Sequence, residues 1–268
     1  MSRLAYLFVL LLMTVSFSAM AQNSSSQTAQ DFFSLGIQLE EQGEYERAIE
    51  AFSEAIRLSP DMWEAYSKRG CVSMDYLMII LLNSPLDINS FFEEQSGFID
   101  TAIVDLSNAI RLNPRDANSY FYRGFAYSAK YENILAIADY TQAINLDSGF
   151  VNAYFNRGNK YFILGDYERA ISDISTAISI TPNADMAAYS MLGYIYFHIQ
   201  NYERAVFEFN RAFVLDPEQF FFYDIRGLCY IHLEEFELAI SDLNRALQLD
   251  PSNELAREAI ESLTQSGR

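Results

Sequence analysis

Along most of this chain, short blocks with apolar residues at intervals of three and four alternate with polar breaks. One block carries its apolar residues at Ala170, Ile171, Ile174, Ala177 and Ile178. This spacing places apolar side chains on one face of an α-helix. A proline falls in the break that follows, at Pro182, where a helix has to stop. The pattern therefore predicts a series of short amphipathic helices joined by turns.

The same arrangement occurs six times, most completely between Tyr154 and Pro182. Its glycine recurs at Gly36, Gly70, Gly124, Gly158, Gly193 and Gly227. Successive glycines lie 34, 54, 34, 35 and 34 residues apart, and two alanine positions repeat with the same set of intervals. A single helical hairpin of this size cannot bury its apolar face, whereas stacked neighbours can. The period therefore predicts a stack of helical hairpins.

The repeated positions resemble those of the tetratricopeptide repeat, a helix–turn–helix unit of about 34 residues. In the fourth copy the matching residues are Tyr154, Gly158, Tyr161, Ala170, Ile174, Ala177 and Pro182. The resemblance implies an all-α fold, a right-handed α-solenoid of six repeats with a C-terminal capping helix. The expected repeats are 29–62, 63–116, 117–150, 151–184, 186–219 and 220–253, and the capping helix with its tail is 254–268.

The second repeat contains an insertion, because Ala48 and Ala102 are 54 residues apart. The extra residues are Leu77–Ser96, between the two helices of that repeat. We expect Leu77–Leu82 to prolong the first helix, and Ser90 to begin a short second one because Glu93 follows at capping-box spacing. This apolar insertion either folds back onto neighbouring helices or serves as a docking site, for a partner or for a second copy in an oligomer.

The first residues have the pattern of a secretory signal. Arg3 precedes the uncharged run Leu4–Phe17, and the small residues Ala19 and Ala21 lie where a signal peptidase would cleave, before Gln22. We expect residues 1–21 to be a signal peptide and residues 22–28 a flexible lead-in, so that the mature protein is exported, periplasmic or extracellular, without stable membrane insertion. An uncleaved anchor is disfavoured because a spanning helix needs about 20 apolar residues.

Acidic residues outnumber basic ones by 36 to 18, which gives a net charge of −18. This excess argues against nucleic acid as a partner, since affinity for phosphate depends on cationic side chains. Two interpretations of the acidity stay open. It either keeps an exported protein soluble or favours a basic partner.

No residue pattern indicates catalysis, a metal or a cofactor. The sequence lacks a phosphate-binding glycine loop and a nucleophile elbow. His198 and His232 share one repeat position but lack the further ligands that a zinc site requires. Cys71 and Cys229 lie four repeats apart, too far for a disulfide in a stack of helices.

Four of the six repeats carry an arginine and an aspartate at fixed positions. The pairs are Arg69 with Asp105, Arg123 with Asp139, Arg157 with Asp173 and Arg226 with Asp242. Repeats one and five lack both residues. Because partly buried charges need partners, the co-occurrence predicts an ion pair between the two helices of each of these hairpins.

The resemblance also implies that the first helices line a concave groove. The residues expected there as partner-binding residues are Phe121, Phe125, Asn152, Phe155, Asn159, Phe162, Tyr194, Phe197, Phe221 and Leu228. Aromatic rings supply contact area, and amides can pair with the backbone of an extended peptide. We therefore expect a non-catalytic scaffold that binds a protein or peptide segment. Two alternatives stay open: a carrier of an apolar ligand or lipid, and an auxiliary subunit of an envelope enzyme or secretion complex.

Overall fold

The computed structural model describes residues 27–84, 88–181, 186–215, 217 and 222–265, and within these residues the chain forms helices and no strand. The first helices of the six hairpins are α2 (Ala29–Glu41), α4 (Trp63–Leu82), α7 (Ala117–Ala129), α9 (Val151–Ile163), α11 (Met186–His198) and α13 (Tyr223–His232). The second helices are α3 (Tyr45–Leu58), α6 (Ser96–Leu112), α8 (Asn133–Leu146), α10 (Tyr167–Ile180), α12 (Tyr202–Leu215) and α14 (Phe236–Leu249). Between α4 and α6 lies α5 (Ile88–Glu94), and α15 (Glu254–Gln265) follows the last hairpin.

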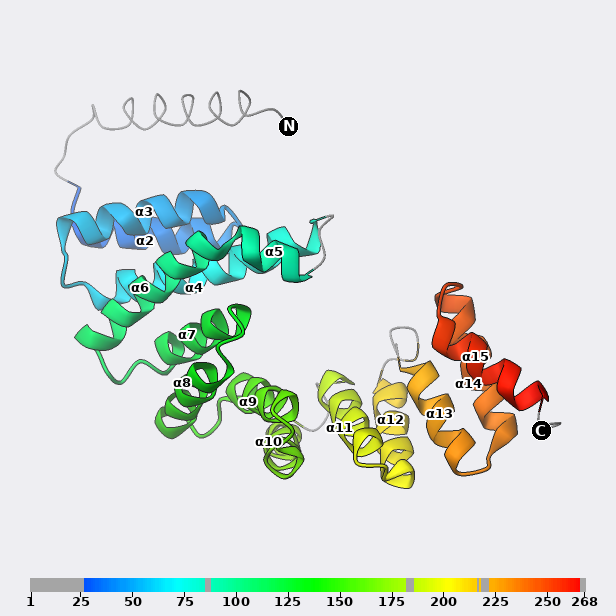
Figure 1. Ribbon diagram of the computed structural model, residues 1–268. Helices are drawn as coiled ribbons and strands as arrows, with labels where there is room; N and C mark the ends of the chain where they lie inside the picture. Colours follow the sequence, from blue (N-terminus) through cyan, green and yellow to red (C-terminus); the bar gives the residue numbers. More distant parts are fainter. Residues whose placement is uncertain (1–26, 85–87, 182–185, 216, 218–221, 266–268) are drawn as a thin grey trace.

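The hairpins follow one another along an arch. Each second helix packs against its own first helix and against the first helix of the next hairpin. Figure 1 shows that the stack curves, so that its two ends rise on the same side of a central hollow. The predicted all-α solenoid is confirmed.

The repeated glycine allows the two helices of a hairpin to approach closely. A Cβ atom added to Gly158 would lie 2.9 Å from Cδ1 of Ile174, and one added to Gly70 would lie 2.6 Å from Cγ of Leu106. Both contacts are shorter than packed carbon atoms tolerate. A side chain at this position would therefore push the hairpin open, which is the physical reason why glycine recurs there.

The turn inside most hairpins has one residue with a left-handed backbone. The φ angle is 76° at Gly43, 60° at Tyr131, 78° at Gly165, 62° at Gln200 and 61° at Glu234. Glycine adopts this conformation without a steric penalty, and the other three side chains do so at a cost. The turn geometry is therefore imposed by helix packing and not by the local residue type.

The predicted ion pairs are all formed, and each one connects three helices. Arg157 donates from Nε to Asp173 Oδ2 at 2.7 Å and from Nη2 to Asp173 Oδ1 at 2.8 Å, and its Nη1 reaches Thr141 Oγ1 on the preceding α8 at 3.0 Å. The other arginines repeat this geometry, with Ser53, Ser107 and Asn210 in the place of Thr141. The hydrogen bonds to Asp173 raise the pKa of Arg157 further. These pairs join neighbouring repeats as well as the helices of one hairpin.

Repeat five has other residues at the positions of the arginine–aspartate pair. Leu192 takes the place of the arginine, and Glu208 takes the place of the aspartate with its side chain fully buried. Arg204 and Arg211 on the same helix each approach Glu208 to 3.3 Å. Burial raises the pKa of Glu208, and the two arginines offset only part of this rise.

The insertion in repeat two is partly buried on its own chain. The first helix α4 continues to Leu82, as predicted, whereas α5 begins at Ile88, so that Ser90 lies inside the short helix and not at its start. The capping-box spacing failed as a start signal because the same serine-to-glutamate interval also fits inside a helix. Leu77 and Phe91 are buried, but Leu82 is 82% exposed. An oligomer formed through residues 77–96 stays a prediction.

The last helix covers the end of the stack. Ala256 and Leu263 of α15 are buried in the cluster formed with the preceding repeats, and Asn253 caps the helix by accepting a hydrogen bond from Ala256 N–H at 2.9 Å. Among the described residues, no helix has both the length and the apolar character needed to cross a membrane. The expected signal peptide, residues 1–21, and nearly all of the lead-in lie outside the described residues.

Candidate functional site

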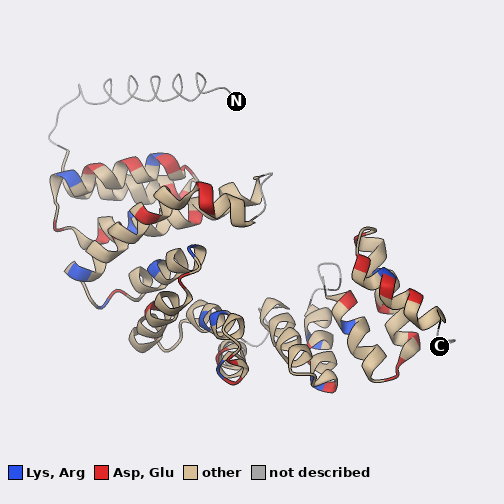
Figure 2. Cartoon of the chain, in the orientation of Figure 1, with Lys and Arg blue, Asp and Glu red and all other residues tan. Residues whose placement is uncertain are grey.

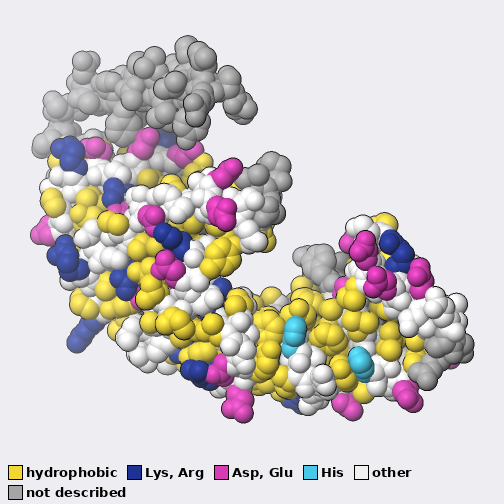
Figure 3. Space-filling view, viewed as in Figure 1, with side chains coloured by type: hydrophobic (Ala, Val, Ile, Leu, Met, Phe, Trp, Pro, Cys, Tyr) yellow, Lys and Arg dark blue, Asp and Glu magenta, His cyan; other side chains and the backbone are white. Residues whose placement is uncertain are grey.

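The half of the concave face that belongs to repeats four to six carries a group of aromatic side chains in mutual contact. Ring centroids are 5.5 Å apart for Phe162 and Tyr194, 4.6 Å for Tyr194 and His198, and 5.9 Å for Phe197 and His198. Phe222 adjoins Tyr194 at 6.1 Å. We call these five residues the aromatic cluster. Figure 3 shows a band of hydrophobic side chains over α9, α11 and α13, with both histidines on the same face.

The aromatic cluster is half-exposed and almost uncharged. Phe162, Tyr194 and Phe197 keep part of their surface accessible, and His198 is exposed. The helix that contributes Tyr194 and Phe197, α11, contains no lysine, arginine, aspartate or glutamate, as Figure 2 also shows. Apolar rings on an open concave surface are typical of interaction sites.

The other predicted groove residues are distributed more widely. Phe155 and Asn159 are half-buried, Asn152 is exposed, and Leu228 is half-buried on α13. Phe221 lies outside the described residues. The partner-binding role of these residues stays a prediction, and their positions place most of them along one stretch of α9, α11 and α13.

Phe121 and Phe125 do not join the aromatic cluster. Phe121 is only 9% exposed and packs against Tyr140 and Phe150, with ring centroids at 5.8 and 4.8 Å. Phe125 packs with the apolar residues of the insertion and α6. Phe121 therefore offers little surface to a partner, because its ring fills the space between α7, α8 and the start of the next hairpin.

A lysine is buried beside the predicted amide Asn159. Lys160 is only 8% exposed, and burial lowers its pKa. No ion pair or hydrogen bond joins its amino group to any other described residue. Its repeat position is occupied by the buried apolar residues Ala126, Ile195 and Cys229 in other repeats. Lys160 therefore replaces a core residue and is not part of the exposed face.

The two histidines pack against aromatic rings and not within a group of metal ligands. His198 belongs to the aromatic cluster, whereas His232 stacks on Tyr202 with centroids 4.1 Å apart. The described part of the chain contains no group of three or more histidine, cysteine, aspartate or glutamate residues that could hold a metal ion. Cys71 and Cys229 are both buried and free, and burial raises the pKa of each thiol.

The other half of the concave face contains a cavity that the sequence analysis missed. It has a volume of about 320 Å³ and lies between α2, α4 and α7. We call it the α4 cavity. Its lining residues are Phe33, Glu40, Trp63, Glu64, Ser67, Lys68, Cys71, Asp75, Asp116, Asn118 and Tyr122.

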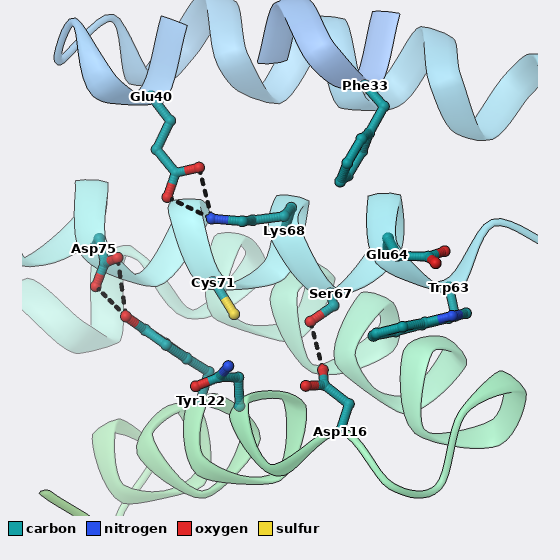
Figure 4. Close-up of a pocket in the computed structure, with 11 residues that line it drawn as sticks. Phe33, Glu40, Trp63, Glu64, Ser67, Lys68, Cys71, Asp75, Asp116 and Tyr122 are labelled. Carbon is teal, nitrogen blue, oxygen red and sulfur yellow. Dashed lines mark hydrogen bonds and ion pairs between the residues drawn. The ribbon is translucent and has the colours of Figure 1, made fainter. Parts of the chain in front are cut away.

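Figure 4 shows how these side chains are arranged. Phe33, Trp63 and Glu64 gather at one end of the α4 cavity, near Ser67 and Asp116, while Asp75 and Tyr122 form the other end. Hydrogen bonds connect the polar side chains that line the bottom of the cavity. Asp116 Oδ2, at the N-terminus of α7, accepts from Ser67 Oγ at 2.7 Å and from Ser119 N–H at 3.2 Å.

The far end of the cavity contains a carboxylate and a phenol. Tyr122 OH donates to Asp75 at 3.0 Å, and Lys68 Nζ bonds both carboxylate oxygens of Glu40, at 3.0 and 2.9 Å. Burial raises the pKa of Asp75, and the hydrogen bond from Tyr122 offsets only part of this rise. The α4 cavity therefore contains four carboxylates and one ammonium group.

The repeat positions would have identified some of the residues that line this cavity, but not the cavity itself. Phe33, Ser67 and Asp75 occupy the same positions in repeats one and two as Phe155 and His198 do in repeats four and five. The groove residues predicted from the sequence begin only at repeat three, with Phe121. No interval along the chain indicates that α2, α4 and α7 leave a gap between them.

Comparisons with known proteins match the repeats directly. A family model described as a TPR repeat matches residues 38–72, and models described as tetratricopeptide repeat match residues 151–184, 186–219 and 225–253. No curated protein sequence matches the chain.

Several solved structures share the fold. The structure of YrrB, a TPR protein with an unusual peptide-binding site, is 19% identical, with a TM-score of 0.60 over 80% of this chain and 99% of that one. PilF from Pseudomonas aeruginosa is 13% identical, with a TM-score of 0.68 over 87% of this chain and 97% of that one. MamA is 24% identical, with a TM-score of 0.57 over 69% of this chain and 95% of that one.

Proposed function

Because the chain belongs to the tetratricopeptide-repeat family, whose repeats form protein-interaction scaffolds, we propose that it binds a segment of another protein along its concave face and catalyses no reaction. The aromatic cluster carries this proposal. Its rings come from α9, α11 and the residue before α13, and although they pack against the core of repeats four to six, they keep accessible surface. Rings held in place by their neighbours lose little entropy when a partner binds.

The likeness to YrrB supports a peptide as the bound element. That protein is described as having a peptide-binding site, and it shares the fold at low sequence identity. An extended or helical segment fits a groove lined by parallel first helices, because its side chains can alternate between adjacent helices. The proposal assigns the backbone contacts of such a segment to the amides of half-buried Asn159 and exposed Asn152.

Selection of binding peptides tests this proposal. Peptides selected from a random displayed library on the wild-type protein are titrated by fluorescence anisotropy against Phe162→Ala and against Phe207→Ala. Phe207 is a matched control, since it is half-exposed on the second helix α12. We expect Phe162→Ala to weaken binding at least about tenfold and Phe207→Ala to leave it unchanged. Equal losses in the two variants, or failure to select any peptide, would contradict the proposal.

The same protein can be examined for a bound apolar ligand. Native mass spectrometry of the purified chain would show an added mass if the aromatic cluster served a lipid or another apolar carrier function. The peptide proposal expects the mass of the polypeptide alone. A stoichiometric small molecule that phenylalanine-to-alanine changes in the cluster release would favour the carrier.

We further propose that the scaffold acts outside the cytoplasm. The support is the sequence pattern of Arg3, the run Leu4–Phe17 and the small residues before Gln22. The intact mass of the protein recovered from an exporting host gives its first residue. Gln22 is the expected start, and a protein that keeps residues 1–21 would refute the cleavage.

A further inference from the structure

The α4 cavity and the aromatic cluster lie on the same concave face but differ in charge. Four of the eleven residues that line the cavity are aspartate or glutamate, and one is lysine. The bonds between Lys68 Nζ and the Glu40 carboxylate neutralise only that carboxylate. An occupant that carries positive charge would therefore be favoured and an anion repelled.

The remaining carboxylates have no cation of their own. Asp116 bonds only hydroxyl and backbone groups, all through Oδ2, and Asp75 bonds only the Tyr122 phenol. Glu64 forms no hydrogen bond or ion pair with any described residue. A half-buried carboxylate without a cation is destabilised by loss of water, and a cationic ligand would remove that cost.

The end of the cavity near Glu64 also has aromatic walls. Phe33 extends from α2 and Trp63 from the start of α4, and both rings border the space beside Glu64 (Figure 4). A flat cation stacks on such rings and can still donate hydrogen bonds in its plane. A lysine ammonium, in contrast, is a compact and strongly hydrated charge that gains less from a flat aromatic wall.

We propose that this end of the α4 cavity takes the guanidinium group of an arginine side chain from the bound partner segment. Trp63 and Phe33 enclose the guanidinium plane, and Glu64 and the free oxygen of Asp116 accept its N–H groups. The inference depends on the proposed scaffold function for the source of the arginine, and it assigns charge selectivity to one end of the groove.

The chain contains its own reporter for this site. Trp63 is the single tryptophan of the sequence, so the emission of the protein reports on the α4 cavity alone. The probe is N-acetyl-arginine amide, and the comparison probe is N-acetyl-citrulline amide, which has nearly the same shape without the charge. For a ligand of this size we expect a dissociation constant of roughly 1 mM for the arginine probe. The citrulline probe should leave the emission unchanged in that range.

Single variants locate the guanidinium. Glu64→Gln should weaken the arginine probe at least about threefold, and Asp75→Asn at the far end should weaken it less. Glu258→Gln is the matched control, because it removes the same charge from an exposed site on α15. It should leave the affinity unchanged. Melting curves of all three variants verify that the fold is intact.

Several results would overturn the assignment. Equal responses to the arginine and citrulline probes would show that charge is not recognised, and a lysine derivative that binds as tightly as the arginine one would exclude a guanidinium site. An unchanged affinity in Glu64→Gln would remove Glu64 from the site. If selected peptides bind and depend on Phe162 but are indifferent to arginine-to-citrulline replacement, the scaffold proposal stands and the arginine inference fails.

Discussion

The two ends of the concave face use the same helix positions for opposite chemistry. In repeats four to six these positions carry Phe162, Tyr194 and Phe197, whose rings are joined in one cluster through His198, on a helix α11 without charged residues. At the same positions repeats one and two carry Glu40 and Cys71, around a cavity with an excess of carboxylates. Both ends are built from the same kind of helical hairpin, although α4 is longer than the other first helices, and the side chains that line each end decide its chemistry. Fold and ligand chemistry are therefore set by different residues.

Arginine–aspartate pairs stabilise the helix packing at both ends of the concave face. The substitution Asp173→Asn removes one of these pairs and has the largest expected effect. The variant leaves Arg157 half-buried without its carboxylate, and we expect the free energy of unfolding to fall by about 3 kcal/mol. Urea denaturation measures this change. Glu168→Gln, an exposed change on the same helix, is the control and should alter stability little.

The same variant distinguishes framework from binding surface. Affinities for the arginine probe and for a selected peptide should be unchanged in Asp173→Asn under conditions where it is folded. A large loss of affinity together with an unchanged unfolding curve would mean that the pair belongs to a binding site.

Tyr194→Ala should separate the two ends of the face. It removes the ring that contacts Phe162, His198 and Phe222, and we expect peptide affinity to fall at least about tenfold because central aromatic residues dominate interfaces. The arginine probe should bind as before, as judged by Trp63 emission. A matching loss of both affinities would show that the two ends act as one site.

Salt should affect the two ends unequally. Raising the ionic strength from about 50 to about 500 mM should weaken the arginine probe by about threefold, because screening acts on the charges of the α4 cavity. A peptide that binds only through the aromatic cluster should lose almost nothing. Titrations at several salt concentrations measure both, and equal slopes would argue against the difference in chemistry.

The smallest expected effect concerns Asp75, whose burial in the α4 cavity lowers the stability of the fold at neutral pH. Burial raises the folded-state pKa of Asp75, so the folded protein binds more protons than the unfolded chain in the range above the ordinary aspartate value. Its contribution to stability therefore falls as the pH rises through that range. Asp75→Asn should raise stability slightly at pH 7, with the gain disappearing in acid. A loss of stability at neutral pH would show that Asp75 stabilises the fold.

Much of the fold could be predicted from the sequence. The glycine at Gly158 and the aspartate at Asp173 recur with their partners at fixed intervals, and each meets the predicted neighbour. The extension of α4 to Leu82 was also predicted, whereas the start of α5 was placed two residues too late. The recurring positions predicted contacts correctly because the same contact forms in repeat after repeat. The capping-box spacing at Ser90 occurs only once, so no other repeat supports it.

The candidate site was only half predictable. Repeat positions led to Phe162, Tyr194 and Phe197, which the structure brings together. Another repeat position gave Phe121, whose ring instead packs against Tyr140 and Phe150, whereas Phe155 at the same position of repeat four keeps part of its surface accessible. The α4 cavity escaped notice, since its polar residues resemble ordinary surface when they are seen one at a time.

The sequence by itself determined the number of hairpins, the close contacts made by glycine and alanine, and the ion pairs between the two helices of four hairpins. These features depend on intervals along the chain, and helix geometry converts an interval into a contact. Only the tertiary structure decided which rings touch, that α2, α4 and α7 leave a cavity, and which carboxylates there lack a cation. Those outcomes depend on how successive hairpins tilt against one another, which is a sum of many packing contacts and is not encoded in any single interval.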